Sequence, residues 1–443
     1  MQTIDLLVLP RWLVPVEPAG LVLEEHALAV DGGRIVDVLP AAFARQAFQP
    51  RETIELPDHA VLPGLVNIHT HAAMSLLRGM SDDLPLMDWL QNHIWPAEGA
   101  NVSYGFCADG VRLAAAEMIR GGTTCFNDMY FFPDATAAVA AEIGLRASVG
   151  LVVFDFPTPW AQNWEEYIHR GLEVHDRLRG DPLVRAVFAP HAPYTVSDAP
   201  LKRVRELATE LGIGIHMHLH ETAAEIEGGL QSGGKRPWQR LRELDLLGQD
   251  FIAVHMTQLS DAEIAEAGSL GVSVAHCPES NLKLASGFCP VARLLAAGVN
   301  VALGTDGAAS NNDLDMLGEM RTAALLAKGV SGDASALPAH AALRMATLAG
   351  ARAAGLEDQI GSLEKGKAAD FIAVDLNRPA TQPVYNVLSQ LVYATSRDQV
   401  TDVYVAGRAL LREGKLLTLN EAETLAKAAE WRQRIVPQGP KRS

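Results

Sequence analysis

Short apolar runs alternate with longer amphipathic segments through the middle of the chain. Between several of the runs lie Ala-, Leu- and Glu-rich stretches with helical spacing, namely Tyr104–Arg120, Ala199–Leu211 and Asp261–Ser269. Strands that alternate with helices over this length predict an α/β fold of the (β/α)8 barrel type, although a doubly wound open sheet would show the same alternation. The expected strands are Gly64–His69, Thr123–Asp128, Arg146–Val153, Val184–Ala189, Gly214–His220, Phe251–His255, Gly271–His276 and Asn300–Gly304.

The two ends of the chain have a different pattern, with short strands joined by hairpin-type turns such as Asp31-Gly32-Gly33 and Ala406-Gly407. We therefore expect a small β-sandwich domain formed jointly by both termini, followed by a surface helix and a loose tail. The expected strands are Thr3–Leu9, Ala27–Val30, Arg34–Leu39, Asp370–Asp375, Asp402–Val405 and Arg408–Arg412, the helix is Glu421–Ile435, and the tail is Pro437–Ser443. The predicted division is 1–61 and 365–420 for the β-domain, 62–364 for the barrel and 421–443 for the C-terminal helix and tail.

Composition narrows the function classes. The chain has 443 residues and a formal net charge of -16, without a Lys/Arg cluster that could follow a phosphate backbone, so nucleic acid is not an expected partner. No apolar run reaches the roughly 20 residues that span a bilayer. The start lacks the features of a secretory leader, and the cysteines are isolated, which is typical of free thiols in a reducing cytoplasm. They are Cys107, Cys125, Cys277 and Cys289.

One apolar strand ends in His69-Thr70-His71. Because side chains alternate along a strand, both imidazoles point to the same side and could bind one divalent cation. Taken alone, the pair could equally be two histidines at a solvated strand end.

Other predicted strands also end in metal-ligating or acid–base groups. His191 closes the fourth strand, and Asp306 follows the eighth. Because the catalytic groups of a barrel enzyme gather at the C-terminal ends of its strands, these residues predict an enzyme site with a bound metal. The strands between them end in His218, His255 and His276.

Several motifs together resemble the amidohydrolase superfamily: His69-Thr70-His71, His218 with Glu221 three residues later, His255, and Leu303-Gly304-Thr305-Asp306-Gly307. Pro190–Tyr194, Ser280–Leu284 and Thr305–Asn312 are further similar to the 5′-methylthioadenosine/S-adenosylhomocysteine deaminases, and the resemblance covers nearly the whole chain. It implies zinc-dependent hydrolytic deamination of the adenine ring of 5′-methylthioadenosine, and also of adenosine and S-adenosylhomocysteine, to the inosine analogue and ammonia.

The resemblance implies one zinc ion per chain, held by His69, His71, His218 and Asp306. Three neutral nitrogens and a carboxylate leave room for a water whose pKa the metal lowers. Asp306 would also take that water's proton, His255 would stabilise the attacking oxygen, and Glu221 would carry protons to the ring nitrogen and the departing ammonia. Two-metal members carry a lysine where this chain has Ala189-Pro190-His191, which favours a single ion.

Spacing alone does not choose the ligand on the fifth strand, since His216, His218 and His220 alternate. The family's His-x-x-Glu motif selects His218. We expect His216 to be a core residue or a support for a ligand, His220 to lie near the pocket border, and His276 to be a packed or supporting group.

For the substrate, the resemblance implies that Glu98 accepts hydrogen bonds from both ribose hydroxyls and that His191 meets the nucleoside. Trp95, Ser310, Glu221 and Asp306 complete the expected substrate-binding set. Phe154–Trp164, rich in Phe, Pro and Trp, suits a lid over an apolar thioether. Some family members hold the carboxylate of S-adenosylhomocysteine with an arginine just after strand three. Here Gly150–Phe154 has none, and Arg146 is expected at the wrong end of its strand.

Two alternatives stay open. A deaminase or chlorohydrolase of another heterocycle (guanine, a pterin or an s-triazine) would share the metal ligands, and Glu98 is the main discriminator. A catalytically silent scaffold would have lost ligands that are all present here. The sequence does not rank the nucleosides, establish a metal beyond a preference for zinc, or settle whether the chain forms a homo-oligomer.

Overall fold

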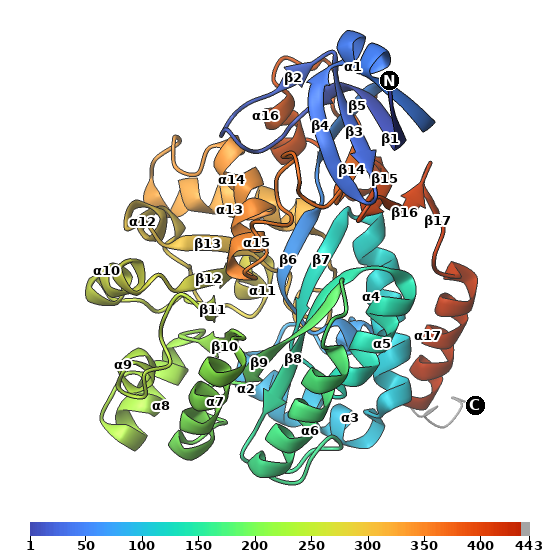
Figure 1. Ribbon diagram of the computed structural model, residues 1–443. Coiled ribbons are helices and arrows are strands. Elements are labelled where there is room, and N and C mark those ends of the chain that lie inside the picture. The colour runs from blue at the N-terminus through green and yellow to red at the C-terminus, as the bar shows by residue number, and fades with distance from the viewer. Residues whose placement is uncertain (436–443) are drawn as a thin grey trace, which may run out of the picture.

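A computed structural model describes residues 1–435 and contains the predicted barrel (Figure 1). Eight strands pair in parallel and in chain order, and the last returns to the first through a bridge between Thr70 and Asp306. The (β/α)8 prediction is therefore confirmed, since an open doubly wound sheet would not follow chain order. The strands are β6 (Leu65–Thr70), β7 (Thr123–Asp128), β8 (Arg146–Val153), β9 (Val184–Pro190), β10 (Ile215–Leu219), β11 (Phe251–His255), β12 (Ser273–His276) and β13 (Asn300–Leu303).

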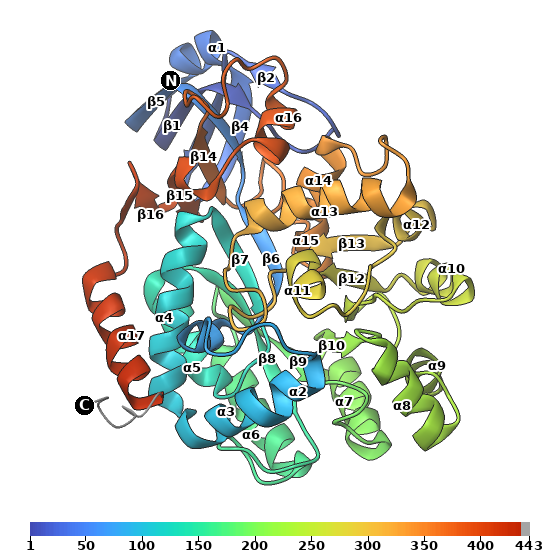
Figure 2. The same ribbon diagram turned by 180° about the vertical axis from the view of Figure 1, so that it is seen from behind.

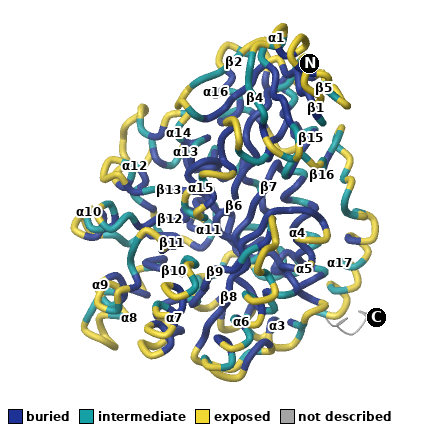
Figure 3. The backbone as a smooth tube through the Cα atoms, in the orientation of Figure 1, coloured by how far each residue is buried: buried dark blue, intermediate teal, exposed yellow. Residues whose placement is uncertain are grey.

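The barrel strands are buried almost throughout, as Figure 3 shows, which explains why they appear in the sequence as unbroken apolar runs. Three of them, β7, β8 and β11, have the predicted bounds. β12 begins two residues later than expected, at Ser273, because Gly271 adopts a left-handed conformation (φ 74°) that ends helix α10.

Helices cover the outside of the barrel, and the terminal β-domain lies at the top of the view (Figures 1 and 2). Among the described residues, no helix is long and apolar enough to cross a membrane. The longer helices are α4 (Tyr104–Arg120), α5 (Pro133–Ile143), α6 (Trp164–Leu178), α7 (Asp198–Leu211), α8 (Ala223–Gly233), α10 (Asp261–Leu270), α13 (Met316–Ser331) and α17 (Glu421–Ile435). The shorter ones are α1 (Ala41–Ala47), α2 (Leu86–Trp89), α3 (Trp95–Asn101), α9 (Pro237–Glu243), α11 (Pro278–Lys283), α12 (Val291–Ala296), α14 (Ala339–Met345), α15 (Leu348–Ala353) and α16 (Val387–Tyr393), with single turns at η1 (Ala72–Leu77), η2 (Leu90–Ile94) and η3 (Arg397–Gln399).

A separate nine-stranded sheet from both ends of the chain fits the predicted small sandwich domain. Its central strand, β5, joins the halves, because it pairs in parallel with β1 and antiparallel with β14. The sequence reading missed β5 and placed the barrel boundary at residue 61, whereas the strand continues to Pro63. The strands are β1 (Gln2–Leu13), β2 (Leu23–Glu24), β3 (His26–Asp31), β4 (Arg34–Pro40), β5 (Phe48–Pro63), β14 (Phe371–Asp375), β15 (Val400–Val405), β16 (Arg408–Arg412) and β17 (Lys415–Leu416).

A buried ion pair joins the two domains. Arg146 opens β8 at the N-terminal end of the barrel, as predicted, and its Nε lies 3.0 Å from Asp370 Oδ2. The other carboxylate oxygen of Asp370 accepts a hydrogen bond from the backbone N–H of Ala406. Arg146 therefore contacts the β-domain and lies at the opposite end of the barrel from its C-terminal rim.

The C-terminal helix α17 has the predicted bounds and packs along α4, which both ribbon views show (Figures 1 and 2). The Trp431 ring meets Phe106 edge-on at 5.2 Å between centroids, and its Nε1–H donates to Asp109. Arg120 of α4 binds Glu421 at the start of the helix. The predicted loose tail, Pro437–Ser443, lies outside the described residues.

Candidate metal centre and substrate pocket

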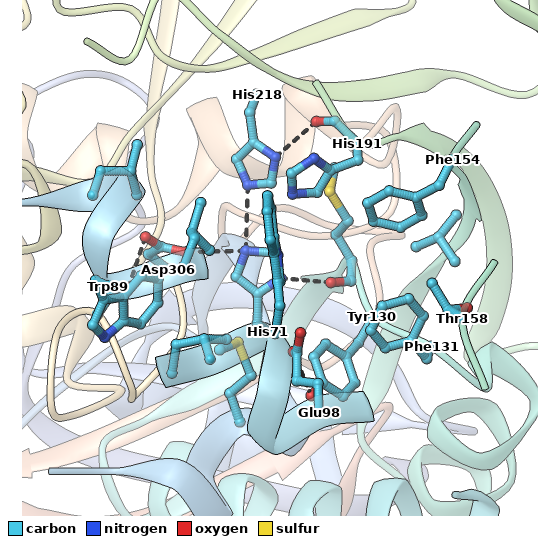
Figure 4. A pocket seen from close by; sticks show the side chains of 18 of the residues that line it. His71, Trp89, Glu98, Tyr130, Phe131, Phe154, Thr158, His191, His218 and Asp306 are labelled. Atoms are coloured by element: carbon cyan, nitrogen blue, oxygen red, sulfur yellow. Dashed lines mark hydrogen bonds and ion pairs between the residues drawn. The ribbon is translucent and has the colours of Figure 1, made fainter. Parts of the chain in front are cut away.

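Three imidazoles and one carboxylate converge inside the C-terminal mouth of the barrel, and Figure 4 shows His71, His218 and Asp306 of this group. Their ligand atoms all lie within 4.8 Å of one another. The residues are those that the sequence singled out: His69 and His71 at the end of β6, His218 in β10 and Asp306 just after β13. Strands that are far apart in the sequence therefore bring their C-terminal ends together at one site.

Hydrogen bonds at the far side of each ring orient the histidines. Nδ1–H of His71 donates to the Met129 carbonyl at 2.5 Å, and Nδ1–H of His218 donates to the His191 carbonyl at 2.7 Å. Nδ1 of His69 is bonded to Nε2 of His216 at 2.9 Å. These contacts turn each Nε2 towards the common centre, which is how outer hydrogen bonds select the ligating nitrogen in metal sites. His216 is therefore a support for a ligand, as expected.

Asp306 is held in place by three donors. Its Oδ1 accepts from the Gly307 N–H at 2.8 Å, and its Oδ2 accepts from Ser280 Oγ at 2.6 Å and Ser310 Oγ at 2.8 Å. The residue has a left-handed backbone (φ 60°), a strained conformation that is enriched at functional sites. Burial opposes the charge, yet the imidazoles of His69 and His71, each 3.2 Å from Asp306 Oδ1, hold the pKa of Asp306 well below its usual range.

A glycine permits the close approach of β13 to His69. A Cβ on Gly304 would lie 2.8 Å from both the backbone N and the Cβ of His69. Any side chain at this position would therefore displace the first ligand, which explains the glycine in the Leu303–Gly307 motif.

The donor set fits a zinc ion. Nε2 of His69 is buried without a hydrogen-bond partner in residues 1–435 and lies 3.2 Å from Asp306 Oδ1, the same distance as Nε2 of His71. Although burial opposes it, Asp306 raises the pKa of His71 to about 9, so the centre attracts positive charge. Three nitrogens and one carboxylate with a further position left for water are the donors of catalytic zinc sites.

Glu221 and His255 lie next to this centre. Nε2 of His255 is 3.8 Å from Glu221 Oε2, and its Nδ1–H donates to Asn281 Oδ1 at 2.9 Å. Burial raises the pKa of Glu221. A carboxyl group with a raised pKa beside a metal centre is suited to hold and release a proton near neutral pH.

A cavity with mostly apolar walls opens onto the centre (Figure 4). Phe131, Phe154 and Phe156 form one wall, and His191 stacks on Phe154 with 4.7 Å between centroids. Among the described residues, no lysine or arginine lines it. All the predicted substrate-binding residues line the cavity: Trp95, Glu98, His191, Glu221, Asp306 and Ser310.

The expectation for the segment Phe154–Trp164 needs one correction. Phe156 and Pro157 to Pro159 line the cavity, but the Trp160 side chain is buried outside it against Phe132, with 5.1 Å between the ring centroids. The hydrogen bond from Thr158 N to the Ala161 carbonyl bends the segment there, which turns Trp160 inwards.

The two histidines whose roles the sequence left open besides His216 do not line the substrate cavity. His220 adopts a left-handed backbone (φ 53°), and its Nε2 accepts from the Trp238 N–H at 3.0 Å, so it does not border the pocket. His276 is fully packed and neither ring nitrogen has a partner among the described residues.

Sequence reasoning missed a contribution from the loop after β7. Tyr130 lines the cavity, and its hydroxyl donates to Glu98 Oε1 at 2.8 Å. Tyr130 lies two residues beyond the end of β7, and this position was the one sequence signal that could have placed it in the site. Ser280 and Asn281 stood in a recognised motif, but their partners, Asp306 and His255, could be assigned only from the structure.

Glu98 is buried, and this burial raises its pKa to about 7. Ionised Glu98 therefore costs stability in the folded protein. This group's contribution is fully present below its unfolded pKa near 4.5 and is lost as pH rises through about 7. We expect Glu98→Gln to raise the free energy of unfolding by about 3 kcal/mol at pH 8 and by little at pH 4.5. Urea unfolding at both pH values measures this, and an equal effect at both would contradict it.

The comparisons with known proteins agree with this site. Residues 60–410 match the Amidohydrolase family. A 5-methylthioadenosine/S-adenosylhomocysteine deaminase from Saccharophagus degradans is 50% identical over 98% of this chain and 97% of its own length. A zinc-bound structure of an adenosine deaminase from Xanthomonas campestris has 56% identity, a TM-score of 0.97, and covers 98% of this chain and 99% of its own. An atrazine chlorohydrolase from Arthrobacter aurescens, at 22% identity and TM-score 0.90 over 96% of this chain and 99% of its own, shares the fold.

The barrel, the terminal β-domain and the converging His/His/His/Asp ligands define a metal-dependent hydrolase of the amidohydrolase class. Within that class, the chain belongs to the family of 5-methylthioadenosine/S-adenosylhomocysteine deaminases. The predictions of a hydrolytic deaminase and of a zinc cofactor are confirmed.

Proposed function

We propose that this protein removes the amino group from the adenine ring of 5′-methylthioadenosine and of adenosine by hydrolysis. The observation that carries the proposal is a cavity that joins the metal centre to a buried carboxylate, Glu98, and to an aromatic wall. A purine nucleoside would contact all three features of the cavity. The ring carbon that bears the amino group would lie at the metal centre, the ribose at Glu98 and an apolar tail against the aromatic wall.

Each acid–base group has a role in this reaction. Zinc, when bound by His69, His71, His218 and Asp306, supplies a Lewis acid that lowers the pKa of water. Asp306 accepts the proton of the attacking water, and His255, oriented by Asn281, stabilises the oxygen during attack. Glu221 delivers a proton to the ring nitrogen and then to the departing ammonia.

The tail of the substrate meets uncharged walls. Phe154, Phe156 and the Pro157–Pro159 segment offer apolar surface to a methylthio group. The carboxylate of S-adenosylhomocysteine would find no cation among the described residues of the cavity, and an unpaired buried charge is costly. We therefore propose S-adenosylhomocysteine as a weaker substrate.

The substrate order tests the proposal. We expect kcat/KM to be highest for methylthioadenosine and adenosine, lower for S-adenosylhomocysteine and far lower for free adenine, because a buried acid that lacks its hydroxyl donors penalises the base. Glu98→Ala should lower kcat/KM for the nucleosides by about 10- to 100-fold and narrow the gap to adenine. Steady-state kinetics on the four compounds measures this.

The control is Glu165→Ala, which removes an exposed carboxylate from α6. It should leave the order unchanged. If free adenine or guanine were the best substrate, the nucleoside assignment would fail, although the metal centre would stand.

We further propose that the protein acts on free nucleosides in the cytoplasm. The four cysteines are free and buried, which supports a reducing compartment. The formal net charge of -16 disfavours a phosphate backbone as a partner.

A further inference from the structure

The short loop after β7 contacts both functional parts of the cavity. The Met129 carbonyl accepts the hydrogen bond that orients His71, and the next residue, Tyr130, donates its hydroxyl to Glu98 at 2.8 Å. Two consecutive residues thus connect a metal ligand to the acid expected to bind ribose.

The loop is fixed firmly at its base. Asp128, the last residue of β7, accepts hydrogen bonds from the Ala72 N–H at 2.8 Å and from the hydroxyls of Thr70 and Thr136. The Met129 N–H donates to the Thr70 carbonyl at 2.9 Å. These bonds tie the loop to the strand that carries His69 and His71, so the Tyr130 hydroxyl has a set position relative to the metal centre.

Glu98, by contrast, comes from a separate helical segment. Helix α3 spans only Trp95–Asn101 and follows the irregular turn Leu90–Ile94. Among the described residues, the Tyr130 hydroxyl is the side-chain donor to Glu98. That bond engages Oε1, and Oε2 accepts no hydrogen bond from the described residues.

We propose that Tyr130 is a positioning residue that holds Glu98 in the orientation that accepts the ribose hydroxyls, and so sets the preference for nucleosides over free bases. This inference rests on the proposed function, in which Glu98 meets the ribose. Because the Glu98 carboxylate is already oriented, no conformational entropy is lost in ordering it when the substrate binds. We therefore expect the hydrogen bond from Tyr130 to strengthen substrate binding.

Tyr130→Phe tests the proposal because it removes one hydroxyl and keeps the ring. We expect kcat/KM for adenosine to fall roughly 10- to 100-fold, mainly through KM, the range for a hydrogen bond to a charged group. Activity on free adenine and the zinc content should be unchanged. Tyr404→Phe is the matched control and should have no effect, because it removes a buried hydroxyl of the β-domain that has no hydrogen-bond partner within the described part of the chain.

A double-mutant cycle with Glu98→Ala separates positioning from general damage. If Tyr130 acts through Glu98, Tyr130→Phe should cause little further loss in the Glu98→Ala background. An undiminished loss there, an unchanged KM in the single variant, or equal losses on adenosine and adenine would overturn the proposal while the nucleoside assignment stands. If Glu98→Ala itself had no effect on nucleosides, the ribose assignment and this inference would both be wrong.

Discussion

Replacing His69 or His218 with alanine should remove both the bound zinc and the activity. Each residue supplies one of four ligand atoms that lie within 4.8 Å of one another, and each ring is oriented by a hydrogen bond at its other nitrogen. With one nitrogen lost, Asp306 and two imidazoles are left to hold a buried cation. We expect less than about a tenth of the wild-type metal content and kcat below detection. Metal analysis by mass spectrometry and a deamination assay measure both quantities.

The control for this experiment is His169→Ala, which removes an exposed imidazole from α6. It should keep one zinc ion per chain and full activity. Two tightly bound ions in fully active protein would contradict a mononuclear centre, and a His218→Ala variant that keeps its zinc would show that His218 is not a ligand.

The barrel could be predicted because its strands are buried on both faces and begin and end at turn residues. Thr123–Asp128 and Phe251–His255 are short apolar runs of this kind, and their predicted bounds were confirmed. β5 was missed because residues 48–63 include three prolines and many exposed charges. Its strand conformation depends on pairing with β1 and β14, which lie far away in the sequence.

The metal ligands could be predicted for a related reason. The C-terminal ends of parallel barrel strands meet at one rim, so position along the strand indicated that His69 and Asp306 come together. On the fifth strand, position alone left several histidines open, and the His-x-x-Glu motif was needed to select His218. Position along a strand does not predict where the side chains of the loops at this rim point. The segment Phe154–Trp164 was expected to cover an apolar thioether, yet a local bend buries Trp160 outside the cavity against Phe132. The bond from Tyr130 to Glu98 depends on two loops packing together.

Glu221→Gln should lower kcat by about 10²- to 10⁴-fold while zinc stays bound, the range for the loss of a general acid–base group. Glutamine keeps the size of the side chain and can still bond to Ser286, whose Oγ lies 3.4 Å from Oε1. What it loses is the titratable carboxyl group, whose pKa burial raises. Because Glu221 is not among the four converging ligands, the metal content should match that of wild type.

The matched control is Glu227→Gln on helix α8, which begins two residues after Glu221; its carboxylate is exposed and is not among the residues that line the cavity. It should retain wild-type kcat. In the Glu221 variant, the loss should fall on kcat rather than on KM, since proton delivery matters in the transition state more than in substrate binding. Wild-type turnover in that variant, or a loss explained entirely by missing zinc, would mean that the protons reach the ring nitrogen and the ammonia by another route. His255, whose Nε2 lies 3.8 Å from Glu221 Oε2, is the first residue to test for that route.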